Sequence, residues 1–293
     1  KSILGNNNMI LARLQPGSTF KPFIYMLSMI KNSYTRYTIF TDKKFTFPWD
    51  YTPKNSDDKY MWRMTLALAL NYSRNIPAVK NYYWAWEEDE IIKFLNPFWI
   101  KSLLDFKKEF EEKYWYEYVY LAPMALWTVQ LTPLELATAY SVFGNNWIKN
   151  NITSILKIED SNWNIIEKND ITKVWIRVLD KKNAIEMNSI LSNKYYKPKD
   201  WNYFLTIPGR DLAAKTWTSS KQYKENEDDE EDTISPRDLW TVWYTPQITT
   251  VVWAWNTSWE KLTWKAYWLT WAWPIMRDFM DFAHKDLEVE KWK

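Results

Sequence analysis

The feature that most constrains this chain is the presence of tryptophan at turns, where a backbone commonly needs glycine. The 293 residues include 4 Gly and 22 Trp, whereas average usage predicts roughly 20 Gly at this length. Tight turns and helix ends often require a positive φ, which glycine adopts freely and bulky residues adopt at a cost. Either bulky residues occupy these positions here, or glycine stands where tryptophan is printed.

The local sequence favours the second explanation. Asn162-Trp163 lies inside an expected hairpin, Ile155–Glu167, where Asn-Gly is typical of a type I′ turn with positive φ at both central residues. Trp99 and Trp147 follow helix-like segments, where a C-cap glycine is common. We therefore predict that most of these tryptophans are glycine in the cell, encoded by UGA. A surface rich in genuine tryptophan that stacks on sugars is the alternative.

Composition excludes several kinds of chemistry. The chain has no cysteine and one histidine, His284, which excludes disulfides, thiol nucleophiles, Cys/His zinc sites and metal centres built from several histidines. A Ser-His-Asp triad would have to use His284. We expect instead a hydroxyl nucleophile paired with a lysine or a carboxylate.

Charge and hydropathy limit the kinds of partner that this chain can have. The net charge is +2, and seven acidic residues gather in 225–232, which is typical of a solvated loop. No basic stripe interleaved with aromatic residues suggests nucleic acid as a partner. The longest apolar run near the start, Pro22–Ile30, is too short to span a bilayer. Because the chain opens on Lys1 without a signal peptide, we expect a fragment whose N-terminal part, with any membrane anchor, is missing.

The pattern of apolar residues predicts a mixed, α+β chain with helices first and strands later. Helices are expected at Phe20–Lys31 (opening at Ser18 and Thr19), Met64–Leu70, Ile76–Tyr83, Glu88–Phe94, Pro133–Phe143 and Lys181–Leu191. Strands are expected at Leu212–Thr218, Leu239–Tyr244, Ile248–Ala254 and Lys265–Thr270. The clearest helix start is Thr132-Pro133 followed by Glu135, which predicts a capping box.

The first of three short motifs pairs Ser18 with Lys21. If Ser18 opens a helix, the two residues lie one turn apart on one face, and the amine can reach the hydroxyl. Serine becomes a good nucleophile when a neighbour takes its proton, and burial with nearby cations can lower the pKa of a lysine enough for that task. A capping serine followed by a solvated lysine gives the same pattern without catalysis.

The second motif is Ser73-Arg74-Asn75. It could be a helix break with a capping side chain, because Pro77 disfavours helix at the residue before it. The functional alternative is a second hydroxyl beside the lysine that relays protons, with an amide that holds a substrate carbonyl.

The third motif is Lys215-Thr216-Trp217-Thr218. It could be an ordinary edge strand with polar side chains facing outward. With glycine at position 217 it becomes Lys-Thr-Gly-Thr, where the missing side chain lets a peptide substrate approach the backbone closely.

Ser-x-x-Lys, Ser-x-Asn and Lys-Thr-Gly in this order form the motif set of penicillin-binding proteins and related β-lactamases. Over nearly its whole length the chain resembles the transpeptidase domain of bifunctional, class A penicillin-binding proteins, in segments 15–23, 51–55, 73–79, 126–137, 238–246 and 269–275. Where that family has glycine, this chain has Trp62, Trp99, Trp127, Trp217, Trp243, Trp255 and Trp271. Trp240 and Trp253 fall where the family itself has tryptophan, and Trp49, Trp115 and Trp292 stay unassigned.

The resemblance implies an antiparallel sheet flanked by helices, with a helical subdomain. It implies a transpeptidase domain over 1–285, with its helical part at about 60–150, an inserted acidic loop at 221–236 and a tail at 286–293.

The resemblance also implies a peptidoglycan D,D-transpeptidase that works through a serine acyl-enzyme, with no metal and no cofactor. Ser18 would be the nucleophile, Lys21 the general base, Ser73 a proton donor to the leaving amine, and Asn75 a substrate-orienting amide. Lys215, Thr216 and Thr218, flanking Trp217, would fix the substrate carboxylate, and the backbone N–H groups of Ser18 and Thr218 would form the oxyanion hole.

The implied partners are peptidoglycan stem peptides, β-lactam antibiotics and other cell-wall synthesis proteins, at the extracytoplasmic face of the bacterial cell membrane. Three alternatives stay open. A serine β-lactamase shares the motifs, but the resemblance to class A proteins, including Gln-Pro-Gly before Ser18, argues against it. A non-catalytic or β-lactam-sensing module would not turn over a peptide. A tryptophan-based carbohydrate-binding protein would present its tryptophans in rows facing solvent.

Overall fold

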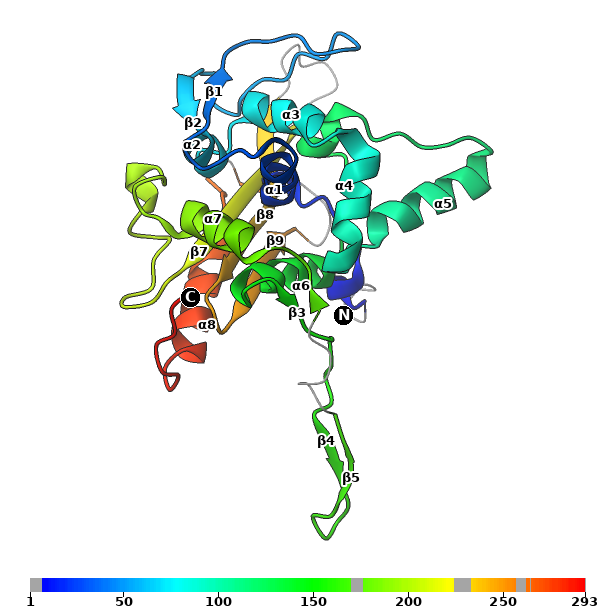
Figure 1. Cartoon of the computed structure of the whole chain (residues 1–293), viewed down its shortest axis with the longest axis vertical. Helices are drawn as coiled ribbons and strands as arrows, with labels where there is room; N and C mark the ends of the chain where they lie inside the picture. The colour runs from blue at the N-terminus through cyan, green and yellow to red at the C-terminus, as the bar shows by residue number, and fades with distance from the viewer. Residues whose placement is uncertain (1–6, 170–175, 224–232, 257–261, 264, 293) are drawn as a thin grey trace.

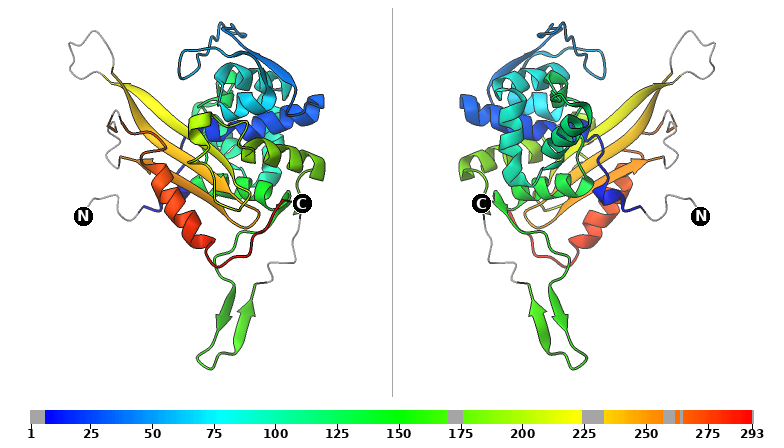
Figure 2. Two further views of the ribbon diagram at one scale, coloured as in Figure 1. Left: turned by 90° about the vertical axis from the view of Figure 1, so that its left-hand side faces the viewer. Right: turned by 90° about the vertical axis from the view of Figure 1, so that its right-hand side faces the viewer.

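A three-stranded antiparallel sheet lies at the centre of the molecule (Figure 1). The computed structural model describes residues 7–169, 176–223, 233–256, 262–263 and 265–292. The sheet consists of β7 (Ala213–Tyr223), β8 (Thr233–Tyr244) and β9 (Thr249–Trp255), in the order β7-β8-β9. Helix α8 (Ala272–Ala283) covers one face, and helices from the first half of the chain cover the other (Figure 2).

The helical part is built around α1 (Lys21–Asn32), whose residues from Lys21 to Met29 are all buried. Its neighbours are α2 (Leu66–Asn71), α3 (Asn75–Trp84), α4 (Glu87–Leu95) and α7 (Lys181–Ser192), while α6 (Pro133–Gly144) packs on β8 and β9. Helix α5 (Ser102–Tyr114) extends to the side (Figure 1). Short 3-10 turns occur at η1 (Met9–Leu11), η2 (Gly17–Thr19), η3 (Asn96–Phe98), η4 (Ala122–Ala125) and η5 (Lys199–Trp201).

Three small antiparallel pairs complete the fold. They are β1 (Ile39–Asp42) with β2 (Trp62–Thr65), β3 (Ile148–Lys149) with β6 (Ile176–Arg177), and β4 (Lys157–Glu159) with β5 (Ile165–Lys168). The β4–β5 hairpin projects away from the body (Figure 2). None of the helices within the described ranges is long and apolar enough to cross a membrane.

The α+β class and the six helices expected from apolar spacing are confirmed, and no helix end differs from the expected one by more than two residues. The strand expected at Lys265–Thr270 is wrong. This segment forms turns because its polar groups bond locally, as from the Thr270 N–H to the Tyr267 carbonyl at 2.9 Å. Its alternating pattern arises because Ala266 and Trp268 are buried against the core without a neighbouring strand. Helices α5 and α8 and the β1–β2 pair were not expected.

The hairpin expected at Ile155–Glu167 is confirmed as the β4–β5 pair, but its expected type I′ turn is wrong. Only Trp163 has a positive φ, at 65°, and the Asp160 N–H bonds across the loop to the Asn164 carbonyl at 3.0 Å. A loop of this length ends with a single left-handed residue rather than two. Trp99 and Trp147 are also left-handed, as their positions after helix-like segments predict. The acidic run at 225–232 lies outside the described residues, and both ends of the loop expected at 221–236 belong to β7 and β8.

The capping box at the start of α6 is confirmed and ties two helices together. The Thr132 hydroxyl accepts from the Glu135 N–H, while the Glu135 carboxylate accepts from the Thr132 N–H. The same carboxylate accepts from the N–H groups of Lys101 and Ser102 at the start of α5. Burial raises the pKa of Glu135, but hydrogen bonds from Ser102 and the backbone N–H groups outweigh it and hold the pKa below its ordinary value.

Glu135→Ala should therefore lower the free energy of unfolding at neutral pH by about 1–3 kcal/mol, through a lost cap and unsatisfied N–H groups. Because the folded-state pKa is depressed, the contribution of the charge is present above the ordinary pKa and is lost as pH falls through the lowered one. Urea unfolding of wild type and variant at neutral and acid pH checks this, with exposed Glu112→Ala as control. An undiminished difference at acid pH would contradict it.

Candidate active site

A cavity of about 450 Å³ opens where η2, the α2–α3 junction and β7 meet. Of the residues proposed from sequence, Ser18, Ser73, Asn75, Thr216, Trp217 and Thr218 all line it. They come from segments far apart in the sequence, so the fold brings the three motifs to one place. The cavity also contains Trp201 and Trp268, whose rings pack edge to face 5.1 Å apart and which the sequence analysis did not single out.

Ser18 lies in the 3-10 turn η2, and α1 begins only at Lys21, so the expected helix start at Ser18 is slightly early. The preceding Gly17 has a φ of +50°, which favours glycine. An ideal Cβ on Gly17 would lie 2.0 Å from the Trp217 ring. Position 17 therefore needs glycine for its φ and, with an indole at 217, also for space.

The Lys21 amine is buried and bonds to the second motif. It donates to the Ser73 carbonyl at 2.6 Å and to Asn75 Oδ1 at 2.7 Å, and lies 3.4 Å from Ser73 Oγ. The helical spacing had suggested that this amine bonds to the Ser18 hydroxyl. The hydrogen bonds described for it go instead to residues 73–75. Burial lowers the pKa of Lys21 well below its ordinary value, and the charges of Lys215 and Arg74 lower it further.

The Lys215 amine approaches Ser73 from the sheet. It donates to Ser73 Oγ and to the Thr216 carbonyl, both at 3.0 Å, and burial lowers its pKa to about 7. Ser73 has a φ of 55°, an uncommon conformation for a residue with a side chain, and it stands between α2 and α3. A hydroxyl between two amines of lowered pKa is well placed to pass protons.

The rest of the cavity wall is fixed by local bonds. Thr218 Oγ1 accepts from the Trp268 N–H at 3.2 Å. Asn75 donates from Nδ2 to the Lys54 carbonyl at 2.6 Å, so its amide is held at both ends. The loop containing Lys54 matches the family over residues 51–55, but sequence alone assigned no role to it.

His284 takes no part in this cavity. Its ring bonds to Thr245 Oγ1 at 2.9 Å and to the Met280 carbonyl at 2.7 Å, at the end of α8. A triad through His284 is therefore not formed. Within the described ranges, no group of three metal-ligating side chains is present.

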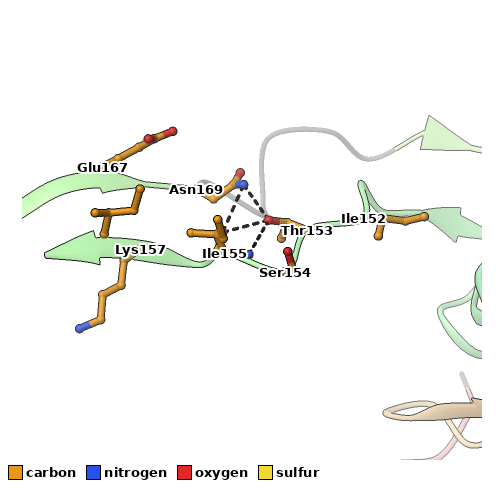
Figure 3. A pocket seen from close by; sticks show the side chains of 8 residues that line it. Ile152, Thr153, Ser154, Ile155, Lys157, Glu167 and Asn169 are labelled. Carbon is orange, nitrogen blue, oxygen red and sulfur yellow. Dashed lines mark hydrogen bonds between the residues drawn. The ribbon is translucent and has the colours of Figure 1, made fainter. Parts of the chain in front are cut away.

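A second hollow lies at the base of the β4–β5 hairpin and has a volume of about 320 Å³ (Figure 3). It is lined by three isoleucines and by the polar residues Thr153, Ser154, Lys157, Glu167 and Asn169. The Thr153 hydroxyl accepts from the backbone N–H of Ile155 at 3.3 Å. All residues proposed from the three motifs lie elsewhere.

Comparison with known proteins identifies the fold around the first cavity. A family model described as "Penicillin binding protein transpeptidase domain" matches residues 5–281. The chain belongs to this family. This penicillin-binding transpeptidase chain is 26% identical over 292 residues to penicillin-binding protein 1A of Neisseria gonorrhoeae, and the match covers 95% of this chain. It is 29% identical over 252 residues to penicillin-binding protein 1A/1B of Bacillus subtilis, covering 85% of this chain.

Solved structures share the fold. Penicillin-binding protein 1A from Haemophilus influenzae has a TM-score of 0.76 at 22% identity, covering 99% of this chain and 45% of that one. PonA1 from Mycobacterium tuberculosis, solved in complex with penicillin V, has a TM-score of 0.78 at 19% identity, covering 99% of this chain and 74% of that one. The matched part of this chain spans 32% of the length of the N. gonorrhoeae relative and 26% of that of the B. subtilis one.

The lowered pKa of Lys21 predicts how stability depends on pH. The folded protein binds a proton at Lys21 less tightly than the unfolded chain, so this group contributes stability that increases as pH rises toward the ordinary value of 10.5. The free energy of unfolding of wild type minus that of Lys21→Met should therefore increase between about pH 7 and about pH 10. Urea unfolding checks this, with exposed Lys44→Met as baseline. A pH-independent difference would contradict the lowered pKa.

Proposed function

We propose that this domain is a serine D,D-transpeptidase that cross-links peptidoglycan stem peptides. The observation that carries the proposal is that the Lys21 and Lys215 amines meet at the hydroxyl of Ser73, which lines the same cavity as Ser18. Activating a serine requires a base with a pKa near the working pH, and both amines have lowered pKa values.

In the first step, Ser18 Oγ attacks the carbonyl carbon of the penultimate D-Ala while its proton passes to the neutral Lys21 amine. The developing oxyanion accepts from the N–H groups of Ser18 and Thr218. As the peptide C–N bond breaks, Ser73 gives its proton to the leaving D-Ala amine, and the protonated Lys21 restores it.

In the second step, an amine from a neighbouring stem peptide attacks the Ser18 ester. It loses a proton through Ser73 and Lys21, and Ser18 leaves with a proton. Lys215, Thr216 and Thr218 hold the terminal carboxylate of the donor, while Asn75 orients its peptide.

A β-lactam antibiotic would acylate Ser18 through the same first step, opening its ring. We place the whole enzyme at the extracytoplasmic face of the bacterial membrane, with other cell-wall synthesis proteins as partners and residues 1–285 as its transpeptidase domain. Residues 286–293 would be the tail, which Arg210 and Asp211 hold against the body through the Glu288 carbonyl and the Lys291 amine.

We also propose that most of the printed tryptophans are glycine in the cell. Of the 14 residues other than glycine with positive φ in the described ranges, seven are tryptophan: Trp49, Trp62, Trp86, Trp99, Trp115, Trp147 and Trp163. Each such residue costs of order 1–2 kcal/mol relative to glycine. This extends the assignment to Trp49 and Trp115, which are also highly exposed, at 85% and 90%. For Trp84 the proposal rests on composition, and for Trp127 and Trp217 it rests on family resemblance as well.

Ser18→Ala should abolish covalent labelling by a fluorescent penicillin and leave the folded state intact. The matched control is Ser28→Ala, because Ser28 is also buried but lies in α1, and this variant should label like wild type. Lys21→Ala should reduce labelling by at least about 100-fold, because the general base is lost. The measurement is in-gel fluorescence against time. Labelling that survives Ser18→Ala would move the nucleophile elsewhere, with Ser73 examined first.

The gene tests the glycine proposal directly. Codons should be UGA at Trp49, Trp62, Trp84, Trp86, Trp99, Trp115, Trp127, Trp147, Trp163 and Trp217, and UGG at Trp240 and Trp253. Peptides of the protein from its own host should have the masses expected for glycine at the first set. UGG codons throughout, or tryptophan masses, would refute the proposal.

A further inference from the structure

The loop between β1 and β2 encloses the second motif through one asparagine. Asn55 is 4% exposed, and its side chain makes three hydrogen bonds. Its Oδ1 accepts from the Asn75 N–H at 2.7 Å, and its Nδ2 donates to Asp42 Oδ1 and to the Lys59 carbonyl, each at 2.9 Å. Both amide protons and the amide oxygen are therefore used.

The same loop fixes the side chain of Asn75. Its Nδ2 donates to the Lys54 carbonyl at 2.6 Å, which leaves Oδ1 to accept from the Lys21 amine at 2.7 Å. The adjoining residues Lys54 and Asn55 thus hold Asn75 by side chain and by backbone. A rotation of Asn75 would remove an acceptor from the buried Lys21 amine.

A buried ion pair anchors the loop from below. Asp42 is fully buried and accepts from Arg74 Nε at 2.8 Å and from the Met61 N–H at 3.0 Å. Arg74 also donates through Nη1 to both carboxylate oxygens of Asp57, at 3.1 and 3.0 Å. Asn55 connects this pair to Asn75, so the hydrogen bonds run from Asp42 through Asn55 and Asn75 to Lys21.

We propose that Asn55 is a positioning residue for acyl transfer, setting Asn75 and, through it, the Lys21 amine. Asn55 does not line the cavity, so it acts only through these neighbours. The inference rests on the proposed function, because it assigns Asn55 to the same reaction. An alternative role, in which Asn55 only anchors the loop, predicts lost stability without lost chemistry.

The first test compares two buried asparagines. Asn55→Ala should reduce the second-order rate constant of acylation by penicillin roughly 10- to 100-fold, since displacement of a reacting group by about 1 Å costs that order. Asn188 is 3% exposed, donates to the Phe143 carbonyl and accepts from the Tyr244 hydroxyl, both at 3.0 Å. Asn188→Ala should lose comparable stability and acylate within about twofold of wild type. Rates are measured where thermal unfolding shows each protein to be folded.

A second variant separates positioning from anchoring. Asn55→Asp keeps the acceptor for the Asn75 N–H, but it puts a second carboxylate next to Asp42, where the amide had donated. The other charged groups nearby are Arg74, which bonds to Asp42, and Asp57, which bonds to Arg74. The Lys21 amine lies on the far side of Asn75. Two adjacent carboxylates raise the pKa of one of them, and a protonated carboxyl can donate as the amide did. The acylation rate relative to wild type should therefore recover as pH falls from about 8 to about 6, in folded protein.

The outcomes are distinguishable. Equal acylation by folded Asn55→Ala and Asn188→Ala would overturn the inference and leave the proposed function standing. A pH-independent ratio for folded Asn55→Asp would overturn it as well. A wild-type protein that penicillin does not acylate would overturn the proposed function and this inference with it.

Discussion

Two lysine amines meet at one serine hydroxyl inside this protein, and the rest of the site is arranged to make that possible. Lys21 and Lys215 are 0% and 3% exposed, and a buried ammonium is costly unless it is hydrogen-bonded. The carbonyls of Ser73 and Thr216 and the Asn75 amide supply those bonds. The cost that remains lowers the pKa of both amines, which is the property that acyl transfer by a serine requires.

The backbone next to these amines is strained, and the ion pair behind it is buried. Ser73 is left-handed between two helices, and Gly17 is left-handed one residue before Ser18. Behind Ser73, Arg74 is paired with a fully buried Asp42, and breaking such a pair by removing one partner leaves an uncompensated charge. Local strain and buried charge therefore lower the stability of the fold here, while they fix the positions of one hydroxyl, two amines and one amide, as is common at functional sites.

Local physics made part of this predictable from sequence. Helix periodicity, the Thr132–Glu135 cap and the left-handed backbone at Trp99, Trp147 and Trp163 are short-range properties, so they could be inferred from neighbouring residues. Residues of all three motifs line the cavity, and the motifs could be recognised because each one lies within four consecutive residues of the sequence. The bonds of Asn55 were missed because its partners Asp42 and Asn75 lie 13 and 20 residues away. Apolar alternation predicted a strand at 265–270, where burial by separate core clusters gives the same pattern.

The most direct test of this account is peptide mapping of the penicillin-treated protein by mass spectrometry. The account predicts one penicilloyl adduct per chain, on the peptide that contains Ser18. Among the cavity hydroxyls that the structure describes, that of Ser18 alone lies in the turn that leads into the helix bearing Lys21. An adduct on the peptide that contains Ser73, or on a surface lysine alone, would contradict it.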